Sequence, residues 1–261
     1  MFVDSHCHLS FPELAARITG IRAEMAAASV DKALCICTTM EEFEQVHALA
    51  MRYDNFWCSA GVHPDNEGVR EPRLEDLATM AGRPRVAAIG ETGLDYYRLD
   101  GRSLDEMEWQ RERFRVHVRA ARATGLPLVI HTRSASQDTL RILREEGAQA
   151  AGGVFHCFTE TMQVAREALD LGFYISFSGI LTFKNAVELQ EVARYTPLDR
   201  CLIETDSPFL APAPFRGKTN TPALVPHVAA KLAALKEMPV EEVARATSEN
   251  FEALFKTSRF T

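Results

Sequence analysis

The chain has 261 residues, of which 46% are hydrophobic and 25% charged, and its formal net charge is −7. This composition is ordinary for a soluble globular protein with a large core, and its acidic balance argues against a non-specific, basic nucleic-acid binder. No apolar run approaches the ~18 residues of a membrane span and no basic-then-apolar leader is present, so we expect a cytoplasmic protein without membrane contact or an obligate protein partner.

Short apolar runs alternate with amphipathic segments along the whole chain. Strands are expected over residues 2–4, 32–37, 56–61, 86–90, 128–130, 153–155, 174–177 and 200–203. Helices are expected over residues 13–28, 41–52, 74–80, 103–124, 137–146, 162–171, 186–195, 224–236 and 240–255. This alternation is typical of a parallel sheet covered by helices. Eight units in a chain of this length predict one α/β domain over residues 1–261, a (β/α)8 TIM barrel.

The six cysteines mostly lie inside these apolar runs. Cys35 and Cys37 do not have the spacing of a zinc knuckle, and no second pair accompanies them. We therefore expect free thiols that are buried as small hydrophobic groups.

The first expected strand leads into the sequence Asp4-Ser5-His6-Cys7-His8. Side chains two positions apart on a strand point the same way, so His6 and His8 can bind one divalent ion together. Alone, such a pair also fits two surface histidines. Other ligand-type residues follow later strands, however, and a TIM barrel gathers the C-terminal ends of its strands around the active site. The expected metal ligands are His6, His8, Glu91, His131, His156 and Asp206.

Four imidazoles and two carboxylates are enough ligands for two divalent ions. The mixture of nitrogen and oxygen favours zinc, with manganese or magnesium as alternatives. Glu91 is the natural bridge between the ions, and Asp206 could take the proton from an attacking water. Glu204 precedes Asp206 by two residues and could be a further ligand or a group that supports one. Catalytic roles are therefore expected for Glu91, Glu204 and Asp206.

Further residues near these strand ends are candidates for contact with the substrate. His63 either orients the substrate or packs beside Pro64. Asp95 and Tyr96 could line the pocket, although Tyr96 could instead pack under the long helix that follows. Four cations occupy loops on the same face and could hold phosphate groups; they are Arg133, Lys184, Arg216 and Lys218.

Several segments resemble the signature segments of the TatD family of metal-dependent deoxyribonucleases, in order and over nearly the whole chain. The resemblance implies a metal-dependent TIM-barrel hydrolase that acts on DNA phosphodiesters, often as a 3′→5′ exonuclease. It also implies the same six metal ligands. The segments are Asp4-Ser5-His6-Cys7-His8-Leu9, Gly61-Val62-His63-Pro64, Gly90-Glu91-Thr92-Gly93-Leu94-Asp95-Tyr96-Tyr97, Pro127-Leu128-Val129-Ile130-His131-Thr132-Arg133, His156-Cys157-Phe158, Ser178-Gly179-Ile180, Thr182-Phe183-Lys184-Asn185 and Glu204-Thr205-Asp206-Ser207-Pro208.

The chain departs from the family pattern in two places. Family members usually carry Arg-Asn-Glu-Pro after the last strand, whereas Lys218-Thr219-Asn220-Thr221-Pro222 lacks the Arg and the Glu. The family often has Gly where this chain has Glu160. Both changes leave the metal ligands intact but alter a loop expected to hold the substrate. Asn220 is retained and is expected to contact it.

The function predicted from the sequence is a divalent-metal hydrolase that cleaves phosphodiester bonds, with DNA as the substrate. The alternative is a metal-dependent amidohydrolase or a small-molecule phosphoesterase on the same barrel. Many amidohydrolase barrels bridge their metals with a modified Lys at a strand end, and here Glu91 holds that place, which favours the phosphodiesterase. A non-catalytic binding protein is a third hypothesis, against which the intact ligand set argues.

Overall fold

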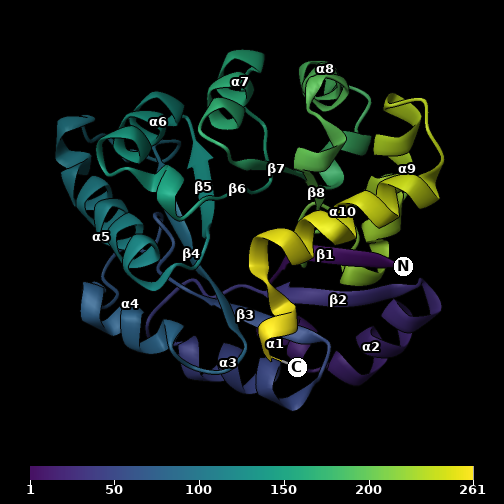
Figure 1. The fold of residues 1–261 in the computed structure, drawn as a ribbon, viewed down its shortest axis with the longest axis horizontal. Helices are drawn as coiled ribbons and strands as arrows, with labels where there is room; N and C mark the ends of the chain where they lie inside the picture. Colours follow the sequence, from purple (N-terminus) through teal and green to yellow (C-terminus); the bar gives the residue numbers. More distant parts are fainter. Residues whose placement is uncertain (261) are drawn as a thin grey trace.

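Each apolar run of the sequence becomes one strand of a parallel sheet that curls into a barrel (Figure 1). The computed structural model describes residues 1–260. Neighbouring strands pair in chain order from first to last, which confirms the predicted (β/α)8 architecture. The strands are β1 (Phe2–Cys7), β2 (Val30–Cys35), β3 (Phe56–Ala60), β4 (Val86–Asp95), β5 (Leu128–Arg133), β6 (Gly153–Phe155), β7 (Tyr174–Phe177) and β8 (Cys201–Ile203).

The helices lie around the outside of the strands, as Figure 1 shows. Within residues 1–260, no helix combines the length and the apolar character needed to cross a membrane. The helix expected over residues 13–28 is two helices, separated at Arg17. The helices are α1 (Pro12–Ala15), α2 (Ile18–Ala27), α3 (Phe43–Arg52), α4 (Leu74–Ala81), α5 (Glu108–Thr124), α6 (Ser136–Glu145), α7 (Met162–Asp170), α8 (Val187–Tyr195), α9 (Val225–Leu235) and α10 (Val240–Phe255).

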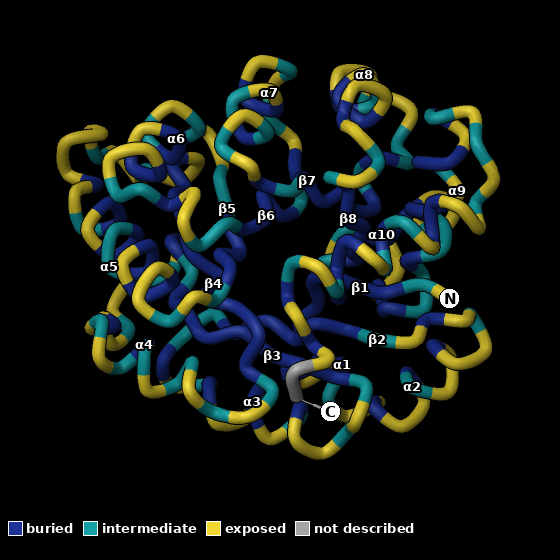
Figure 2. Tube along the Cα trace, in the orientation of Figure 1, coloured by how far each residue is buried: buried dark blue, intermediate teal, exposed yellow. Residues whose placement is uncertain are grey.

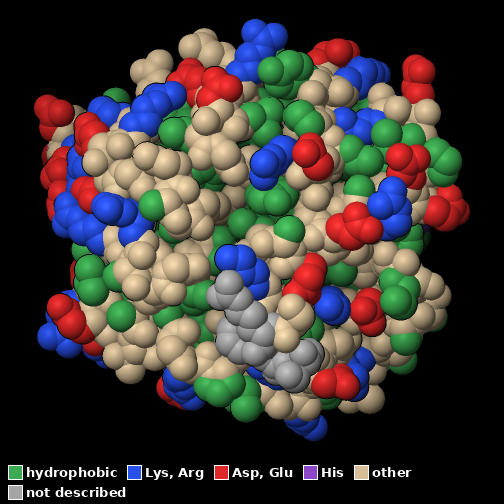
Figure 3. All heavy atoms as spheres, viewed as in Figure 1, with side chains coloured by type: hydrophobic (Ala, Val, Ile, Leu, Met, Phe, Trp, Pro, Cys, Tyr) green, Lys and Arg blue, Asp and Glu red, His purple; other side chains and the backbone are tan. Residues whose placement is uncertain are grey.

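Two apolar layers hold the barrel together, and buried residues follow the strands while exposed residues follow the outer sides of the helices (Figure 2). One layer packs the strands against the helices and includes all the buried cysteines. The other fills the barrel, where Leu34, Trp57 and Val129 meet Phe251 and Phe255 of α10. The C-terminal helix therefore closes the end of the barrel at which the strands begin. Figure 3 shows this face, on which acidic and basic side chains are intermixed.

The expectation of free cysteines is confirmed. All six are free thiols, and each is buried except Cys157, which is partly exposed.

Strands β4 and β5 run further than the sequence predicts, so that Glu91 and His131 lie inside strands. The register shifts between Ile89 and Thr92, after which β4 continues to pair with β5. Gly93 makes this possible: its φ is +132°, and a Cβ there would lie 1.9 Å from the His131 carbonyl oxygen. Gly93 therefore allows an irregular strand to continue past its expected end at residue 90.

The seam between the first and last strands is closed largely by the segment that follows β8. His8 N–H donates to the Ser207 carbonyl oxygen at 2.8 Å, and Asp206 N–H donates to the His6 carbonyl oxygen at 2.9 Å. The fully buried carboxylate of Asp4 accepts from the Thr205 N–H at 2.9 Å and from the Thr205 hydroxyl at 2.5 Å. Asp4 thus joins β1 to the segment that carries Asp206.

Replacing Asp4 with Ala should destabilise the protein by at least about 2 kcal/mol, because buried donors of Thr205 and His6 would be left without their acceptor. Urea unfolding measures this change. The matched control is Asp31→Ala, since Asp31 is an exposed acid on β2 and its removal should change stability by less than about 0.5 kcal/mol. Equal unfolding midpoints for the two variants would contradict the role given to Asp4.

Candidate metal centre

All six predicted metal ligands lie at the C-terminal end of the barrel, and the structure brings their side chains together. His6 and His8 come from β1 and its end, Glu91 and His131 from β4 and β5, and His156 and Asp206 from the segments after β6 and β8. Three sets of donor atoms each lie within 4.8 Å of one another, the distance scale of a shared ion. The sets are His6, His156 and Asp206; His6, His8 and Glu91; and His63, Glu91 and His131.

Glu91 stands at the middle of this cluster and is almost completely buried. Its Oε2 lies 3.3 Å from His6 Nε2 and 3.9 Å from His8 Nε2. Its Oε1 lies 2.8 Å from His156 Nε2 and 3.3 Å from His131 Nδ1. One carboxylate oxygen therefore faces each pair of imidazoles, which is the arrangement a carboxylate needs to bridge two ions.

Asp206 adds a second carboxylate on the side of the β1 histidines. Its Oδ1 lies 3.3 Å from His8 Nε2 and 3.5 Å from His6 Nε2. The backbone at Asp206 is left-handed, with φ +56°, and its N–H is bound to the His6 carbonyl oxygen. The closure of the barrel thus fixes the position of this carboxylate.

His63 belongs to the cluster. The sequence alone leaves its role open between contact with the substrate and packing beside Pro64. Its Nε2 lies 3.4 Å from Glu91 Oε1, so it is a further candidate ligand. Two buried residues of α5 hold the segment in place: Arg113 donates to the His63 carbonyl oxygen at 2.9 Å, and His117 Nε2 accepts from the Val62 N–H at 3.0 Å. Sequence reasoning missed both, and the signal that could have found them is a cation and a histidine on the buried face of the longest helix.

The charges of the cluster suit divalent metal ions. Burial raises the pKa of Glu91, but the imidazoles of His156, His63 and His6 outweigh burial and hold that pKa well below its ordinary value. Burial also raises the pKa of Asp206, but the hydrogen bond from His8 and the nearby imidazoles outweigh burial and lower that pKa below its ordinary value. Both carboxylates are therefore anionic at neutral pH. Anionic carboxylates beside imidazole nitrogens are the donor set of zinc and similar ions, so the residues fit the metals expected from the sequence.

Two further carboxylates, Asp95 and Glu204, each contact one imidazole on the side away from Glu91. Asp95 Oδ2 lies 2.9 Å from His131 Nε2, and Glu204 Oε1 lies 3.2 Å from His156 Nδ1. Glu204 Oε1 also accepts from the Cys157 N–H at 2.9 Å. Carboxylates in this position fix the tautomer and orientation of a metal-binding imidazole. Glu204 is fully buried, so its position favours support of His156 over the catalytic role expected from the sequence.

A cavity of about 750 Å³ opens above the cluster, and Asp95, Arg133 and His63 all contribute to its wall. Tyr96 does not line it: the Tyr96 hydroxyl donates to Asp138 at 2.8 Å and accepts from Arg111 at 3.2 Å, which fits packing under α5. Lys184 also lies outside the wall.

The loop after β8 supplies a neighbouring groove. Lys218 and Arg216 line this shallower groove beside the metal cavity. Asn220 is fully buried, and its amide donates to the carbonyl oxygens of Thr205 at 2.9 Å and Phe209 at 2.7 Å. Asn220 therefore braces the loop, and its position gives no support to the expected substrate contact.

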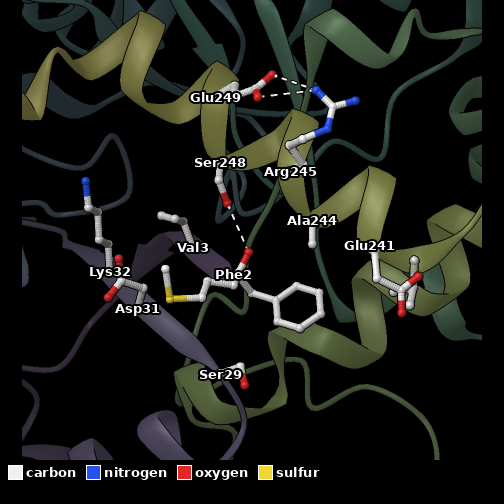
Figure 4. A pocket seen from close by; sticks show the side chains of 12 residues that line it. Phe2, Val3, Ser29, Asp31, Lys32, Glu241, Ala244, Arg245, Ser248 and Glu249 are labelled. Atoms are coloured by element: carbon white, nitrogen blue, oxygen red, sulfur yellow. Dashed lines mark hydrogen bonds and ion pairs between the residues drawn. The ribbon is translucent and has the colours of Figure 1, made fainter.

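Another cavity, of about 510 Å³, lies at the opposite end of the barrel between the starts of β1 and β2 and helix α10 (Figure 4). Its wall contains neither histidine nor cysteine, and Arg245 and Glu249 pair with each other there. Within residues 1–260, clusters of three metal-ligand side chains occur only at the C-terminal end of the strands. The cavity beside α10 therefore offers no candidate metal site.

Comparison with known proteins gives matches over nearly the whole chain. The sequence profile of the TatD related DNase family matches residues 3–256. The uncharacterized metal-dependent hydrolase YcfH of Escherichia coli K12 is 47% identical over 257 residues, or 97% of this chain and 95% of that one. The 3′-5′ ssDNA/RNA exonuclease TatD of Citrobacter rodentium is 34% identical over 239 residues, or 89% of each chain. The crystal structure of YJJV, a TatD homolog from Escherichia coli K12, has a TM-score of 0.91, 30% identity and 98% coverage of each chain.

Metal binding should release protons, and its affinity should increase with pH. Burial lowers the pKa of His156, but the charges of Glu91 and Glu204 outweigh burial and raise that pKa well above its ordinary value. The metal-free imidazole is therefore protonated below this raised pKa, whereas a ligand must be neutral. Titration calorimetry in buffers of different ionisation enthalpy counts the protons. The His156→Ala variant should release fewer, and heats independent of the buffer would refute the expectation.

The Glu204→Gln substitution should weaken metal binding about 10- to 100-fold, because the amide is a poorer partner for the His156 N–H than the carboxylate. Competition with a chromophoric chelator measures the affinity, and circular dichroism verifies that the fold is intact. Unchanged metal affinity together with abolished turnover would instead return Glu204 to a catalytic role.

Proposed function

The chain belongs to the family of TatD-related DNases and is a metal-dependent hydrolase, and from this premise we propose that it cleaves phosphodiester bonds of DNA from the 3′ end. The arrangement of Glu91 carries the proposal, since one carboxylate oxygen faces each of two imidazole pairs. A centre that binds two ions is suited to displacement at phosphorus. The relative from Citrobacter rodentium, named as a 3′-5′ exonuclease of single-stranded DNA and RNA, supports the choice of substrate.

The proposed centre holds two divalent ions, with zinc the first candidate and manganese or magnesium the alternatives. His6, His8 and Asp206 would hold one ion and His131 and His156 the other, and Glu91 offers one carboxylate oxygen to each group. When bound, such ions polarise a phosphoryl oxygen and make water more acidic.

The chain's own residues supply the remaining steps. Asp206 is the proposed acceptor of the proton from the attacking water, because its side chain is 14% exposed to the cavity whereas those of Glu91 and Glu204 are 3% and 0% exposed. Burial lowers the pKa of His63 to about 3, so His63 would meet the substrate as a neutral imidazole. Arg133 in the cavity wall would hold the phosphate, since its guanidinium lies 3.6 Å from the centroid of the Tyr97 ring and no acid within residues 1–260 forms an ion pair with it.

A small-molecule phosphoesterase is the second candidate. The net charge of −7 and the position of Lys184 outside the cavity wall favour a substrate with few phosphates. A metal-dependent amidohydrolase fits less well, because Glu91 stands where such barrels carry a modified lysine.

The cytoplasm is the proposed location. All six cysteines are free thiols, as expected for a protein of a reducing compartment. Fractionation of cells that produce the protein would test this, and recovery with the membrane or outside the cell would contradict it.

The decisive experiment compares substrates and metals. Metal-stripped protein is reloaded with zinc, manganese or magnesium and assayed on single-stranded DNA, duplex DNA, RNA and simple phosphodiesters. Oligonucleotides labelled at the 5′ end should shorten stepwise from the 3′ end. Hydrolysis of simple phosphodiesters without any cleavage of nucleic acid would select the small-molecule candidate.

Asp206→Asn keeps the shape of the side chain and one oxygen, but the amide cannot accept a proton. We expect turnover to fall about 10²- to 10⁴-fold, the usual cost of removing a general base. Steady-state kinetics at saturating metal measures this, with elemental analysis to verify that the ions remain bound. A variant that turns over like the wild type would leave Asp206 as a ligand only.

The double substitution Arg216→Gln and Lys218→Gln should raise KM for an oligonucleotide and leave KM for bis-p-nitrophenyl phosphate unchanged, because the small diester meets only the metal cavity. The slope of log KM against log salt should fall by about 0.7 for each phosphate that the variant no longer binds. Arg144→Gln with Arg194→Gln, on the outer faces of α6 and α8, is the matched control and should change neither. Equal effects on both substrates would argue against a nuclease.

A further inference from the structure

Two phenylalanines stand at the rim of the metal cavity, on the side where β1 and β8 meet. The Phe11 ring is stacked on the imidazole of His8, with centroids 4.7 Å apart and planes 20° apart. The Phe209 ring lies 6.2 Å from that of Phe11, at 76° to it. Both rings line the cavity, and Phe209 is 52% exposed. Single exposed apolar residues are common, but an aromatic pair in contact with a candidate metal ligand is a feature of the site itself.

The backbone that carries Phe209 is held firmly although its ring is exposed. The Phe209 N–H donates to the Asp206 carbonyl oxygen at 3.0 Å, and the Phe209 carbonyl oxygen accepts from Asn220 at 2.7 Å. The next residue packs tightly against Gly179, where a Cβ would lie 1.9 Å from the Leu210 carbonyl oxygen. The ring is therefore presented from a rigid loop, which reduces the entropy cost when a flat ligand stacks on it.

Phe209 also separates the metal cavity from the shallower groove beside it, since it belongs to the walls of both. Arg216 and Lys218 line that groove and are exposed. Arg216 lies over the Phe183 ring and Lys218 over the Phe215 ring, and within residues 1–260 no carboxylate forms an ion pair with either. Metal ligands thus lie on one side of the ring and unpaired cations on the other. A strand with one phosphate at the metals and the next phosphates at the cations would pass its base over Phe209.

We propose that Phe209, supported by Phe11, is a stacking surface for an unpaired nucleobase beside the scissile phosphate. This inference rests on the proposed nuclease function and deepens it, because it names the surface that would hold one base of the substrate. In a duplex both faces of an internal base are covered by its neighbours, so a base beside the scissile phosphate offers a face to Phe209 more readily in a single strand. Base stacking on an aromatic ring contributes enough affinity to change the rate on a subsaturating substrate by about tenfold or more.

The test pairs a variant with a substrate that lacks the base. Wild type, Phe209→Ala and Phe209→Trp are assayed on single-stranded oligonucleotides with natural bases and on oligonucleotides with an abasic sugar at the terminal or the penultimate position. For the wild type, kcat/KM should fall about tenfold at one abasic position. For Phe209→Ala, kcat/KM on the natural strand should be about tenfold below that of the wild type. Its kcat/KM on the abasic strand should equal its own value on the natural strand. Phe209→Trp should retain the preference for the strand that carries the base.

The control variant is Tyr195→Ala, since Tyr195 is a 46% exposed aromatic at the far end of α8. It should behave as the wild type on every substrate. Equal reductions for Phe209→Ala on natural and abasic strands would overturn the inference and leave Phe209 a structural residue. Failure of the wild type to cleave any nucleic acid would instead refute the proposed function, and the inference with it.

Discussion

One buried carboxylate, that of Glu91, holds the site together. Its two oxygens contact histidines from β1, β5 and the segment after β6, which no single element of the barrel could bring together. A charge so deep in a protein is costly unless it is matched by partners on every side. Here imidazoles provide the match, and the far nitrogens of His131 and His156 are in turn matched by Asp95 and Glu204. The site therefore has a carboxylate at its centre, imidazoles around it, and two further carboxylates behind two of those imidazoles. Removal of one of these groups leaves its neighbours without a partner.

The position of the ligands could be predicted from the sequence because two simple rules act together. Alternation along a strand places His6 and His8 on one side, and barrel topology gathers the strand ends around one axis. These rules also locate Glu91, His131 and Asp206 without any knowledge of contacts. They fail where a contact depends on the exact path of a loop or on a distant helix.

His63, Asp4 and Asn220 illustrate that failure. His63 joins the cluster because Arg113 and His117, about fifty positions further along the chain, hold its segment in place. Asp4 looks like part of a metal motif, yet its carboxylate serves the closure of the barrel. The sequence predicts that Asn220 contacts the substrate, whereas in the structure its buried amide donates to the Thr205 carbonyl oxygen and stabilises the loop. In each case the decisive partner lies at least 11 positions away in the sequence, and no local pattern specifies it.

The seam between β1 and the segment after β8 has a consequence for biosynthesis. Residues 4 and 205 are separated by 201 positions, and His6 and His8 precede Asp206 by about three quarters of the chain. Closing so large a loop must wait until the second partner has left the ribosome, and α10, which covers the seam from below, is translated later still. A nascent chain therefore carries an incomplete set of ligands for most of its synthesis. We therefore expect a translation product that stops before Asp206 to be inert, because it lacks a candidate ligand and the segment that closes the barrel.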